Sequence, residues 1–537
     1  MQGIDSDLIR KVTTALEGMR EFVFLETCRP SKNDNRSFLF TDPICRLECT
    51  WSDNVNEFLN SAELYSKQGY FLAGWFEYEF GYLLEPALKR LLWPGKAGKV
   101  VARLGVFEKP LIFDHLTGRF VEGNDWPKAE STLSTVKINN LKTNISRQEF
   151  LADVEKIGRY IKAGDTYQVN YTFKLDFSFV GSPAVLYRQL RRNQSVAYGA
   201  WIRSRGLDIM SFSPELFFSS KGNSIRVRPM KGTLVRGRNV EEDRQMSARL
   251  SMDGKSRSEN VMIVDLLRND LSRLLNNTGG GVVKVQSLFD VEVYESLLQM
   301  TSTIEGIANP SSSIGLADML SFLFPCGSVT GAPKIRTMEI IRELEKEPRN
   351  VYCGALGYYG SGRMCFNVPI RTLTLADGRG SMGIGAGIVH DSDPESEWRE
   401  CLLKANFLTR SRPEFQLIET LCWLPDRGFL FLQEHLERLA SSAEYFFFQM
   451  SDHDVRCRLE QVAEQFSDDC MRVRLLAHKD GRVEVTSSKV TTVSGLEKEL
   501  PAVSFSACRV DADDVFFFHK TTHRPLYNRE RQRAVDQ

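Results

Sequence analysis

Alternating apolar and polar residues between positions 208 and 233 predict two strands joined by a turn at residues 221–223. If the hairpin pairs about that turn, Glu215 lies roughly opposite Arg228, and Lys231 lies about three residues, or ~10 Å, further along. Long side chains can close such a gap, so a carboxyl group and an amine would face one small cavity. Such a pair can perform general-acid and nucleophile chemistry, although a surface Glu and a surface Lys at a hairpin end would show the same pattern.

A helix followed directly by a strand is predicted between residues 146 and 177. Ser146 and Glu149 have the spacing of a capping box, and apolar residues recur on one face of the helix. In the strand, alternate residues from Val169 face one way, and those from Gln168 face the other. From the residues alone, Gln168 is either part of a polar site or an ordinary polar residue on an exposed strand face.

Two further helices carry acidic residues that suit hard metal ions. Glu259 lies near the start of the helix predicted for residues 257–274, where the helix dipole favours an acidic residue whatever its role. Glu397, Glu400 and Lys404 fall at i, i+3 and i+7, so they share one face of a later helix. Oxygen ligands that leave positions for water suit Mg2+, but a solvated charged stripe fits the same spacing.

Three glycine-containing segments offer groups that bind anions. Thr330 and Gly331 lie in FPCGSVTGAPK, whose glycines permit close backbone approach, although a turn leading into a helix has the same composition. The segment CGALGYYGSGRMCFNVPIRTL lacks the strand-turn-helix context of a dinucleotide site. It contributes Arg371 as an anion-binding candidate and Tyr358 as a hydroxyl. Further on, a nest of backbone N–H groups is predicted at Gly385, Ala386 and Gly387.

The composition is that of an ordinary globular protein. Its 537 residues are too many for one core, so two or three domains are expected. Lys+Arg and Asp+Glu both number 69, and a net charge of zero argues against a nucleic-acid or membrane-surface role. No apolar run suits a membrane span or a signal peptide, and eleven scattered cysteines without CxxC suggest reduced thiols, so we expect a cytoplasmic protein. Seven histidines without HExxH spacing argue against a zinc site.

Several long motifs occur in the order found in the chorismate-utilising enzymes, namely SFSPELFF, RPMKGT, ENVMIVDLLRNDL, FPCGSVTGAPK and FNVPIRT. Over roughly residues 20–410 the chain resembles this family, most closely the large subunits of the aminodeoxychorismate synthases. The resemblance implies an α+β fold, with a large intertwined β-sheet core flanked by helices as in component I of the anthranilate synthases. It divides this part into an N-terminal region, residues 1–130, and a chorismate-binding catalytic region, residues 131–410.

The resemblance assigns roles to the acid and the amine of the hairpin. It implies that Glu215 is the general acid on the C4 hydroxyl of chorismate, and that Lys231 attacks C2 with a shift of the double bonds. Ammonia then attacks C4 and releases the lysine, giving 4-amino-4-deoxychorismate for 4-aminobenzoate and folate synthesis. Isochorismate and salicylate synthases carry a water-activating lysine at the position of Gln168. Glutamine cannot act as a base, so ammonia is the expected nucleophile.

The same resemblance supplies the ligand sets. It implies Mg2+ held by Glu259 and Glu400, with Glu397 acting through metal-bound water. The segment FLET at Phe24–Thr27 resembles part of a tryptophan pocket in anthranilate synthases, although an ordinary buried strand also explains it. The residues implied to contact chorismate are Gln168, Thr330, Gly331, Tyr358, Arg371, Gly385, Ala386, Gly387 and Lys404.

Ammonia requires a source, because the chain has no GxCxGxQ nucleophile elbow followed by His-x-Glu. A separate glutamine amidotransferase subunit is therefore the implied partner. Two alternatives stay open. One is an anthranilate synthase large subunit, since that branch differs at Lys231, where it has alanine. The other is a non-catalytic module that binds chorismate or docks a partner.

Residues 411–537 begin a second pattern. FQLIET, HLERL, RVRLL and FHKTTHRPLY resemble the first half of aminodeoxychorismate lyase, a pyridoxal-phosphate enzyme of the branched-chain aminotransferase-like fold. The resemblance implies that Lys520 matches the Schiff-base lysine and that Arg438 matches a phosphate-side arginine. The second half of the lyase pattern does not follow. We therefore expect a truncated, partial α/β segment without lyase activity, with pyridoxal phosphate only if the segment were complete.

Overall fold

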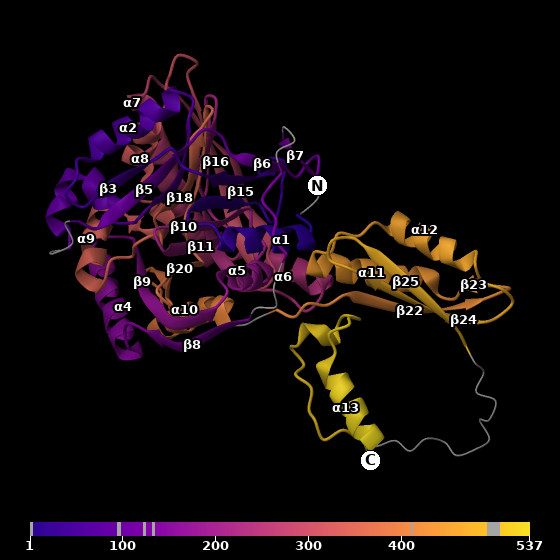
Figure 1. Ribbon diagram of the computed structural model, residues 1–537. Coiled ribbons are helices and arrows are strands. Elements are labelled where there is room, and N and C mark those ends of the chain that lie inside the picture. The colour runs from indigo at the N-terminus through magenta and orange to yellow at the C-terminus, as the bar shows by residue number, and fades with distance from the viewer. Residues whose placement is uncertain are drawn as a thin grey trace. The chain divides into compact units, whose positions relative to one another are not determined.

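The computed structural model shows two compact units, each built from segments that lie far apart in the sequence (Figure 1). The first unit comprises Met1–Leu234 and Leu250–Ser411, and the second comprises Val235–Arg249 and Arg412–Gln537. The residues whose structure is described are 4–93, 98–121, 125–130, 135–409, 412–490 and 505–536.

One sheet of the first unit joins strands from the N-terminal, central and later parts of the chain. Its strand pairs are antiparallel, and β8 (Val136–Thr143) pairs with β9 beside the main path. The order of the described strands along that path is β17 (Gly331–Ala332), β9 (Gln168–Gly181), β21 (Arg379–Ile388), β20 (Thr372–Ala376), β11 (Leu207–Ser213), β10 (Tyr198–Ser204), β1 (Phe22–Glu26), β2 (Arg36–Thr41), β6 (Leu111–Asp114) and β7 (Arg119–Phe120).

A second antiparallel sheet of this unit mixes the same regions of the chain. Strand β15 (Gly281–Val293) pairs with β16 at one side of it. The order of the other described strands is β14 (Met230–Val235), β16 (Leu297–Ala308), β13 (Ser224–Arg228), β12 (Leu216–Lys221), β19 (Arg363–Asn367), β18 (Ala355–Gly360), β4 (Phe71–Phe76), β5 (Val100–Phe107) and β3 (Cys45–Thr50). The predicted α+β fold with intertwined sheets is thereby confirmed.

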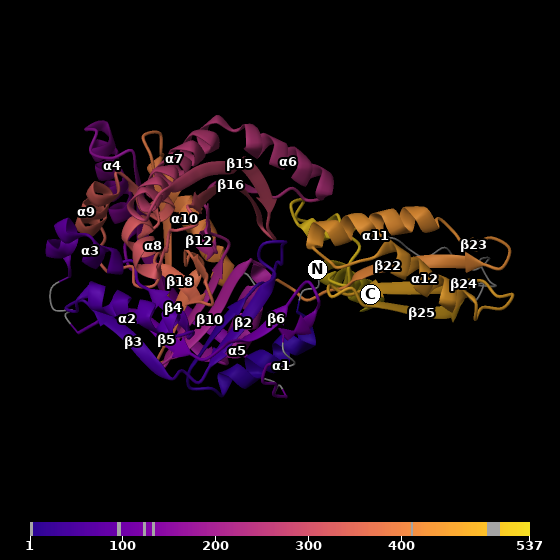
Figure 2. The same cartoon turned by 90° about the horizontal axis from the view of Figure 1, so that it is seen from above.

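Helices cover these sheets, and α7 packs across β15 and β16 (Figure 2). An apolar cluster that includes Phe40, Ala73 and Ile209 contains side chains from both sheets, so the sheets pack on one another through apolar contacts. The helices are α1 (Ser6–Glu17), α2 (Val55–Lys67), α3 (Phe80–Leu84), α4 (Arg147–Lys162), α5 (Pro183–Asn193), α7 (Gly254–Asn277), α8 (Leu316–Leu323), α9 (Lys334–Leu344) and α10 (Pro394–Thr409), with 3-10 turns η1 (Pro86–Leu91) and η3 (Gly327–Val329).

The local elements that position the site follow the sequence closely. Ser146 and Glu149 form the expected capping box at the start of α4. Strands β12 and β13 form the predicted hairpin, and Gly222 at its turn has a φ of +60°, which glycine adopts without strain. A bulge between Leu216 and Ser219 shifts the register, so that Leu216 and not Glu215 pairs with Arg228.

The second unit contains a four-stranded sheet with helices packed against it. Its described strands follow the order β23 (Gly428–Phe429), β22 (Leu417–Leu424), β24 (Met471–Ala477) and β25 (Val483–Lys489). The helices α11 (Leu432–Phe446), α12 (Asp452–Ala463) and α13 (Pro525–Asp536) and the 3-10 turn η4 (Val515–Phe517) complete it, and α6 (Val240–Met252) begins in it.

Residues 235–249 belong to this second unit although the family pattern places them between Lys231 and Glu259. The Tyr445 hydroxyl donates to the carbonyl of Gly237 at 2.8 Å, and Arg236 lies over the Tyr445 ring at 4.0 Å. Val240 enters the unit's apolar core. No local pattern in the sequence indicates these contacts, because the partners lie about two hundred residues apart.

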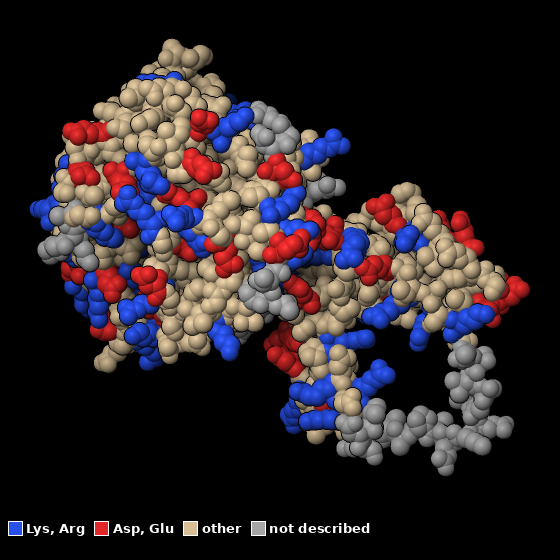
Figure 3. Space-filling model, in the orientation of Figure 1, with Lys and Arg blue, Asp and Glu red and all other residues tan. Residues whose placement is uncertain are grey.

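The surface carries charges of both signs. On the face of the first unit drawn in Figure 3, lysine and arginine side chains are interspersed with aspartate and glutamate. This agrees with the net charge of zero. Within the described part of the chain, none of the helices has the length and apolar character needed to span a lipid bilayer.

Candidate active site

Lys231 lies beside residues from two neighbouring strands of the other sheet. A Cβ atom built on Gly387 would lie 2.7 Å from Lys231 Nζ and 3.5 Å from Gln168 Nε2. Gly387 in β21 pairs with Asn170 in β9, which explains why Gln168 reaches the same point. The absence of a side chain at Gly387 therefore leaves room for the amine, and the two sheets meet at Lys231.

The charged residues around Lys231 are the ones predicted from the sequence. Burial lowers the pKa of the Lys231 amine, and the positive charge of Lys404 adds to this effect. Glu259, Glu215 and Glu400 oppose it by favouring the charged amine. Lys404 forms a 2.8 Å ion pair with Glu400 on α10. The structure thus gathers two amines and three carboxyl groups into one electrostatic environment.

Gly385, Ala386 and Gly387 do not form the predicted anion-binding nest. They lie in β21, in register with Thr172, Tyr171 and Asn170 of β9, so their backbone is extended. The carbonyl of Gly385 accepts a 2.9 Å hydrogen bond from Lys404 Nζ. These residues form a wall of the candidate site. A nest requires alternating helical conformations, which a paired strand excludes.

Glu215 is the most buried carboxyl group of the site, with 3 % of its surface exposed. The Ser328 hydroxyl donates a 2.6 Å hydrogen bond to Glu215 Oε1. Burial raises the pKa of Glu215 to about 7, although the Ser328 hydroxyl and the charge of Lys231 act in the opposite direction. Glu215 can therefore hold a proton near neutral pH, as a general acid must.

Ser328 was not selected from the sequence, although it lies in the quoted loop FPCGSVTGAPK. Its hydroxyl also lies 3.1 Å from Cys326 Sγ, and both side chains are buried. A serine in a glycine-containing loop gives no local sign of what it contacts. The signal that could have found it is its place two residues before Thr330, which was selected.

Gln168 is fully buried, and neither its Oε1 nor its Nε2 has a hydrogen-bond partner among the described residues. Gly331 pairs with Val169 beside it, and a Cβ on Gly331 would lie 2.0 Å from the carbonyl oxygen of Gln168. Glycine is thus required there for close approach. A buried amide without partners is costly in a folded protein, so Gln168 is suited to a polar ligand.

Thr330 has a structural role in this arrangement. Its hydroxyl donates to the carbonyl of Cys326 at 2.9 Å and accepts from the Tyr78 hydroxyl at 3.3 Å. Its carbonyl accepts a 2.8 Å hydrogen bond from the N–H of Asn170. Thr330 therefore links the loop to β9, and its hydroxyl is engaged within the protein.

Arg371 is a half-buried guanidinium whose Nη1 has no hydrogen-bond partner within the described part of the chain. Burial lowers its pKa to about 10, while Tyr294 and Glu295 act in the opposite direction. Its backbone has a φ of +48°, an uncommon conformation for a residue with a side chain. A half-buried guanidinium whose Nη1 lacks a partner among the described residues suits a carboxylate ligand.

The three candidate metal ligands differ in their surroundings. Glu259 on α7 is half-buried, the Glu400 side chain is 48 % exposed, and Glu397 is buried with its pKa raised by desolvation. Among the described residues, no group of three or more His, Cys, Asp or Glu side chains is arranged to hold a metal. Two carboxylates near one amine still fit Mg2+, which commonly takes its other ligands from water and substrate. Glu259 and Glu400 are two carboxylates whose charges act on Lys231.

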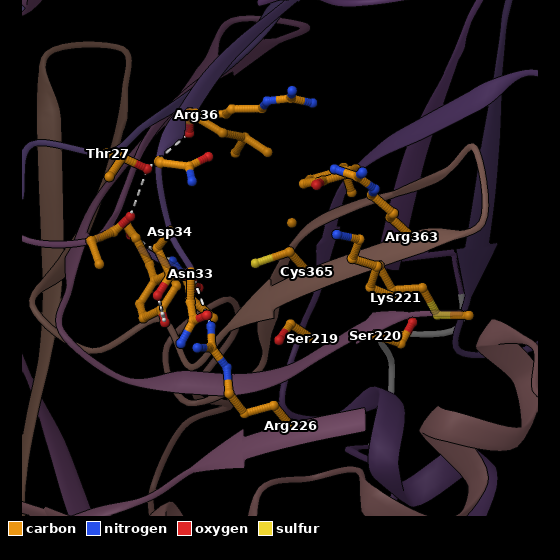
Figure 4. Close-up of a pocket in the computed structure, with 18 of the residues that line it drawn as sticks. Thr27, Asn33, Asp34, Arg36, Ser219, Ser220, Lys221, Arg226, Arg363 and Cys365 are labelled. Atoms are coloured by element: carbon orange, nitrogen blue, oxygen red, sulfur yellow. Dashed lines mark hydrogen bonds and ion pairs between the residues drawn. The ribbon is translucent and has the colours of Figure 1, made fainter. Parts of the chain in front are cut away.

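Tyr358 does not join the other predicted residues. It lies in β18, where its ring packs 4.7 Å from that of Phe38, and it lines a separate cavity of about 570 Å³ (Figure 4). Its neighbour Tyr359 faces the other side of the strand and donates a hydrogen bond to Glu63. Strand alternation thus directs Tyr358 away from Lys231, and the sequence could not fix which face was which because both are apolar.

This second cavity includes Thr27 of the FLET segment. The Thr27 hydroxyl lies within hydrogen-bond distance of the carbonyls of Arg36 and Ala197, at 2.9 and 3.1 Å. Asp34 accepts from the Tyr198 hydroxyl at 3.1 Å and pairs with Arg226 at 2.8 Å. The cavity thus combines aromatic rings with charged groups (Figure 4).

In the second unit, three nitrogen groups converge on Glu419, which is 2 % exposed. Arg438 binds both its oxygens at 2.7 and 2.6 Å, His435 lies at 2.8 Å, and Lys520 Nζ lies at 3.3 Å. Burial alone would raise the pKa of Glu419, but these partners lower it below its ordinary value. The two residues that match the cofactor-binding pattern, Arg438 and Lys520, thus share one buried carboxylate partner.

Comparison with known proteins agrees with this geometry. Residues 21–410 match the family of chorismate binding enzymes, and residues 416–537 match the class IV amino-transferases. The first match covers more than half of the chain, so the protein belongs to the chorismate binding enzyme family.

The similar relatives come from two branches of that family. Aminodeoxychorismate synthase component 1 of Escherichia coli (strain K12) is 35 % identical over 319 residues, which cover 56 % of this chain and 68 % of that protein. A probable chloroplastic aminodeoxychorismate synthase of Oryza sativa subsp. japonica is 37 % identical over 311 residues, 56 % of this chain and 34 % of that protein. Anthranilate synthase component 1 of Streptomyces coelicolor is 38 % identical, covering 52 % of this chain and 54 % of that protein.

Solved structures show the same fold. Anthranilate synthase component I from Streptococcus pneumoniae TIGR4 is 25 % identical with a TM-score of 0.60, covering 72 % of this chain and 94 % of that chain. The menaquinone-specific isochorismate synthase MenF of Escherichia coli is 17 % identical with a TM-score of 0.58, covering 76 % of this chain and 91 % of that chain. The predicted similarity of the fold to that of anthranilate synthase component I is confirmed.

Proposed function

We propose that this protein converts chorismate and ammonia to 4-amino-4-deoxychorismate, in the route to 4-aminobenzoate and folate. The observation that carries the proposal is the position of the Lys231 amine. It is half-buried beside Gly387 and Gln168, and the charge of Glu215 acts on it. An amine with a lowered pKa and a carboxyl group with a raised pKa are the nucleophile and the acid that this reaction needs.

Substrate binding uses the cationic groups of the site. Chorismate carries two carboxylates, and Arg371 and Lys404 would hold them by charge-assisted hydrogen bonds. Glu259 and Glu400 would hold Mg2+, which supplies positive charge for a substrate carboxylate when it is bound. The buried amide of Gln168 would gain partners from the polar edge of the substrate.

The chemical steps then belong to two side chains. Neutral Lys231 attacks C2, the double bonds shift, and the C4 hydroxyl leaves as water after Glu215 has donated its proton. Ammonia attacks C4, the double bonds shift back, and Lys231 leaves as the free amine. A proton from the added ammonia returns to Glu215, so the site is restored for the next turnover.

Gln168 supports ammonia over water as the nucleophile. An amide is neither a base nor an acid near neutral pH, so the residue beside Gly387 cannot activate water. The ammonia is supplied in this proposal by a glutamine amidotransferase subunit. Loss of glutamine-dependent turnover when such a subunit is withheld, with ammonium-dependent turnover retained, is the expected behaviour.

An anthranilate synthase reaction is the second candidate, because relatives of that branch are similarly identical over half of the chain. The two reactions share chorismate, ammonia and a metal, and they differ in the carbon that receives the nitrogen. Lys231 favours the first candidate, since an enzyme that adds ammonia directly at C2 has no use for an amine there.

Identification of the product decides between them. Purified protein is given chorismate, Mg2+ and ammonium, with and without a separate aminodeoxychorismate lyase, and the products are resolved by chromatography. We expect 4-aminobenzoate in the supplemented tube. Anthranilate in both tubes would assign the second candidate, and chorismate bound but unchanged in both would indicate a binding module.

The same experiment tests the second unit. If 4-aminobenzoate forms without added lyase, Lys520 and Arg438 belong to a working site. When pyridoxal phosphate is bound to such a site, it supplies an electron sink for the substrate. If 4-aminobenzoate needs the added enzyme, the ion pairs of Glu419 serve the stability of the second unit instead.

A further inference from the structure

Arg349 is a buried arginine, 4 % exposed, in the segment that follows α9. Its guanidinium forms a two-point ion pair with Glu345 through Nε at 2.9 Å and Nη2 at 2.7 Å. The guanidinium carbon, Cζ, lies over the Tyr78 ring, 4.2 Å from its centre. Glu345 thus neutralises the charge of the guanidinium, and the Tyr78 ring packs against its face. These two contacts fix the direction of the remaining N–H groups.

Those N–H groups donate to two backbone carbonyls from different parts of the chain. Arg349 Nη1 donates to the carbonyl of Val329 at 2.8 Å, and Nη2 donates to that of Asn170 at 2.6 Å. Val329 belongs to the loop before β17, and Asn170 belongs to β9. The partner Glu345 also accepts from the N–H and the hydroxyl of Thr172, both at 2.9 Å.

Each carbonyl lies next to a group of the candidate active site. Val329 follows Ser328, whose hydroxyl binds Glu215. Asn170 pairs with Gly387, the residue that faces Lys231 Nζ. A shift of the loop relative to β9 would therefore move the Ser328 hydroxyl, which binds Glu215, relative to the strand pair that borders Lys231.

We propose that Arg349 is a positioning residue, which sets the separation of Glu215 and Lys231 by holding the loop at Val329 and strand β9 at Asn170 together. The inference rests on the proposed function only where it is tested by kinetics, because that measurement requires turnover of chorismate. Lysine cannot replace arginine here, because a single ammonium group does not make the planar set of four contacts.

The test compares Arg349→Lys with Arg203→Lys. Arg203 is a matched control in the first unit, since it also forms a two-point ion pair, with Asp208 at 2.8 and 3.0 Å, and donates to a backbone carbonyl, that of Glu17, at 2.6 Å. It touches none of the residues placed in the site. Both variants are expected to lower the melting temperature.

Only Arg349→Lys is expected to lower kcat for chorismate, by ~10- to 100-fold with a smaller change in KM, because misplaced reacting groups slow the chemical step. Hydrogen exchange of the free protein gives a second readout. The amide of Asn170, which donates to the carbonyl of Thr330, should exchange faster in Arg349→Lys than in Arg203→Lys.

Equal effects of the two variants on kcat and on exchange would overturn the proposal. If Arg349→Lys does not fold, Glu345→Gln takes its place, with a smaller fall in kcat expected and an unchanged kcat counting against it. Wild-type protein without chorismate turnover contradicts the proposed function instead, and the exchange measurement then still decides whether Arg349 orders the two segments.

Discussion

The hydroxyl of Ser328 donates a 2.6 Å hydrogen bond to Oε1 of Glu215, and both side chains are almost wholly buried. A hydrogen bond of this kind favours the charged carboxylate, whereas burial favours the neutral acid. The balance leaves the pKa of Glu215 at about 7. Ser328 therefore controls the pH range in which Glu215 can donate a proton.

Ser328→Ala is expected to raise the pKa of Glu215 further. A hydrogen bond to a charged group contributes about 1.5–3 kcal/mol, which corresponds to about one to two pKa units. Since the acid acts while protonated, activity is lost as pH rises through this pKa. The alkaline limb of kcat/KM against pH should move upward by that amount.

The control for this shift is Ser37→Ala. Ser37 is also fully buried, and its hydroxyl lies 2.8 Å from His115 Nε2, away from Glu215. The alkaline limb of kcat/KM for Ser37→Ala should stay at the wild-type pH. An unmoved limb in Ser328→Ala would show that Glu215 is not the group that titrates.

Glu215 also makes stability depend on pH. Its folded-state pKa of about 7 lies above the ordinary value of 4.5, so the folded protein keeps a proton that the unfolded chain releases. The stability that depends on protonated Glu215 is fully present below pH 4.5 and is lost as pH rises through 7. Glu215→Gln cannot ionise, so above pH 7 it should be more stable than wild type by about 3 kcal/mol compared with their difference below pH 4.5.

Denaturant unfolding of wild type and Glu215→Gln at pH 4.5 and pH 8 measures this difference. The two free energies of unfolding should converge at the lower pH and diverge at the higher one. A constant difference at both values would mean that Glu215 has an ordinary pKa in the folded protein.

Lys231→Ala removes the amine that is proposed to attack C2. Formation of 4-amino-4-deoxychorismate should fall by at least ~100-fold, because loss of a nucleophile removes the covalent step. Any residual product is expected to be anthranilate, since C2 is then open to ammonia. Lys174→Ala is the control, because Lys174 is a half-buried amine on β9 that pairs with Glu347 at 3.0 Å. Wild-type rate and product in Lys231→Ala would remove Lys231 from the mechanism.

Much of the fold was predictable because its signals are local. The turn at 221–223 and the capping box of Ser146 depend on neighbouring residues, and both were predicted correctly. The bulge at Leu216 was not predicted, since its cause lies in pairing with β19 as well as β13. The assignment of residues 235–249 to the second unit also escaped prediction, because it depends on contacts with residues near 445 and 519.

The candidate site shows the same division between local and distant causes. The motifs singled out Glu215 and Lys231, and the structure places them in one electrostatic environment. Arg349 and Ser328 act through bonds to distant backbone or side chains, so their own sequence context does not show what they contact, although Ser328 lies two residues before Thr330. Tyr358 was expected beside the other site residues but lines a cavity that Lys231 does not line, because alternation defines two faces of a strand without showing which face meets the site.

Tryptophan is expected to bind the cavity that Tyr358 lines. The cavity offers aromatic rings and charged groups, which suit a ligand with an indole ring, an ammonium and a carboxylate (Figure 4). Saturating tryptophan, at about 100 times its Kd, should stabilise the protein by about 2.7 kcal/mol. Cys365→Phe places a ring in the cavity and should abolish the rise in melting temperature, while Cys457→Phe in the second unit should keep it. No rise in wild type would assign the FLET segment to an ordinary buried strand.

Gln168 should contribute to binding at the expense of stability. Its buried amide has no partner among the described residues, and an unsatisfied buried polar group costs about 1–3 kcal/mol. Gln168→Met should therefore raise the free energy of unfolding by about that amount while increasing KM for chorismate. Gln299→Met is the matched control, because Gln299 is also buried but bonds to the carbonyl of Gly232 at 2.9 Å and to the Thr233 hydroxyl. Gln299→Met should lower the free energy of unfolding. If the two substitutions change this free energy in opposite directions, and only Gln168→Met affects KM, Gln168 is a group positioned for substrate. Destabilisation by both would show that the Gln168 amide already has hydrogen-bond partners.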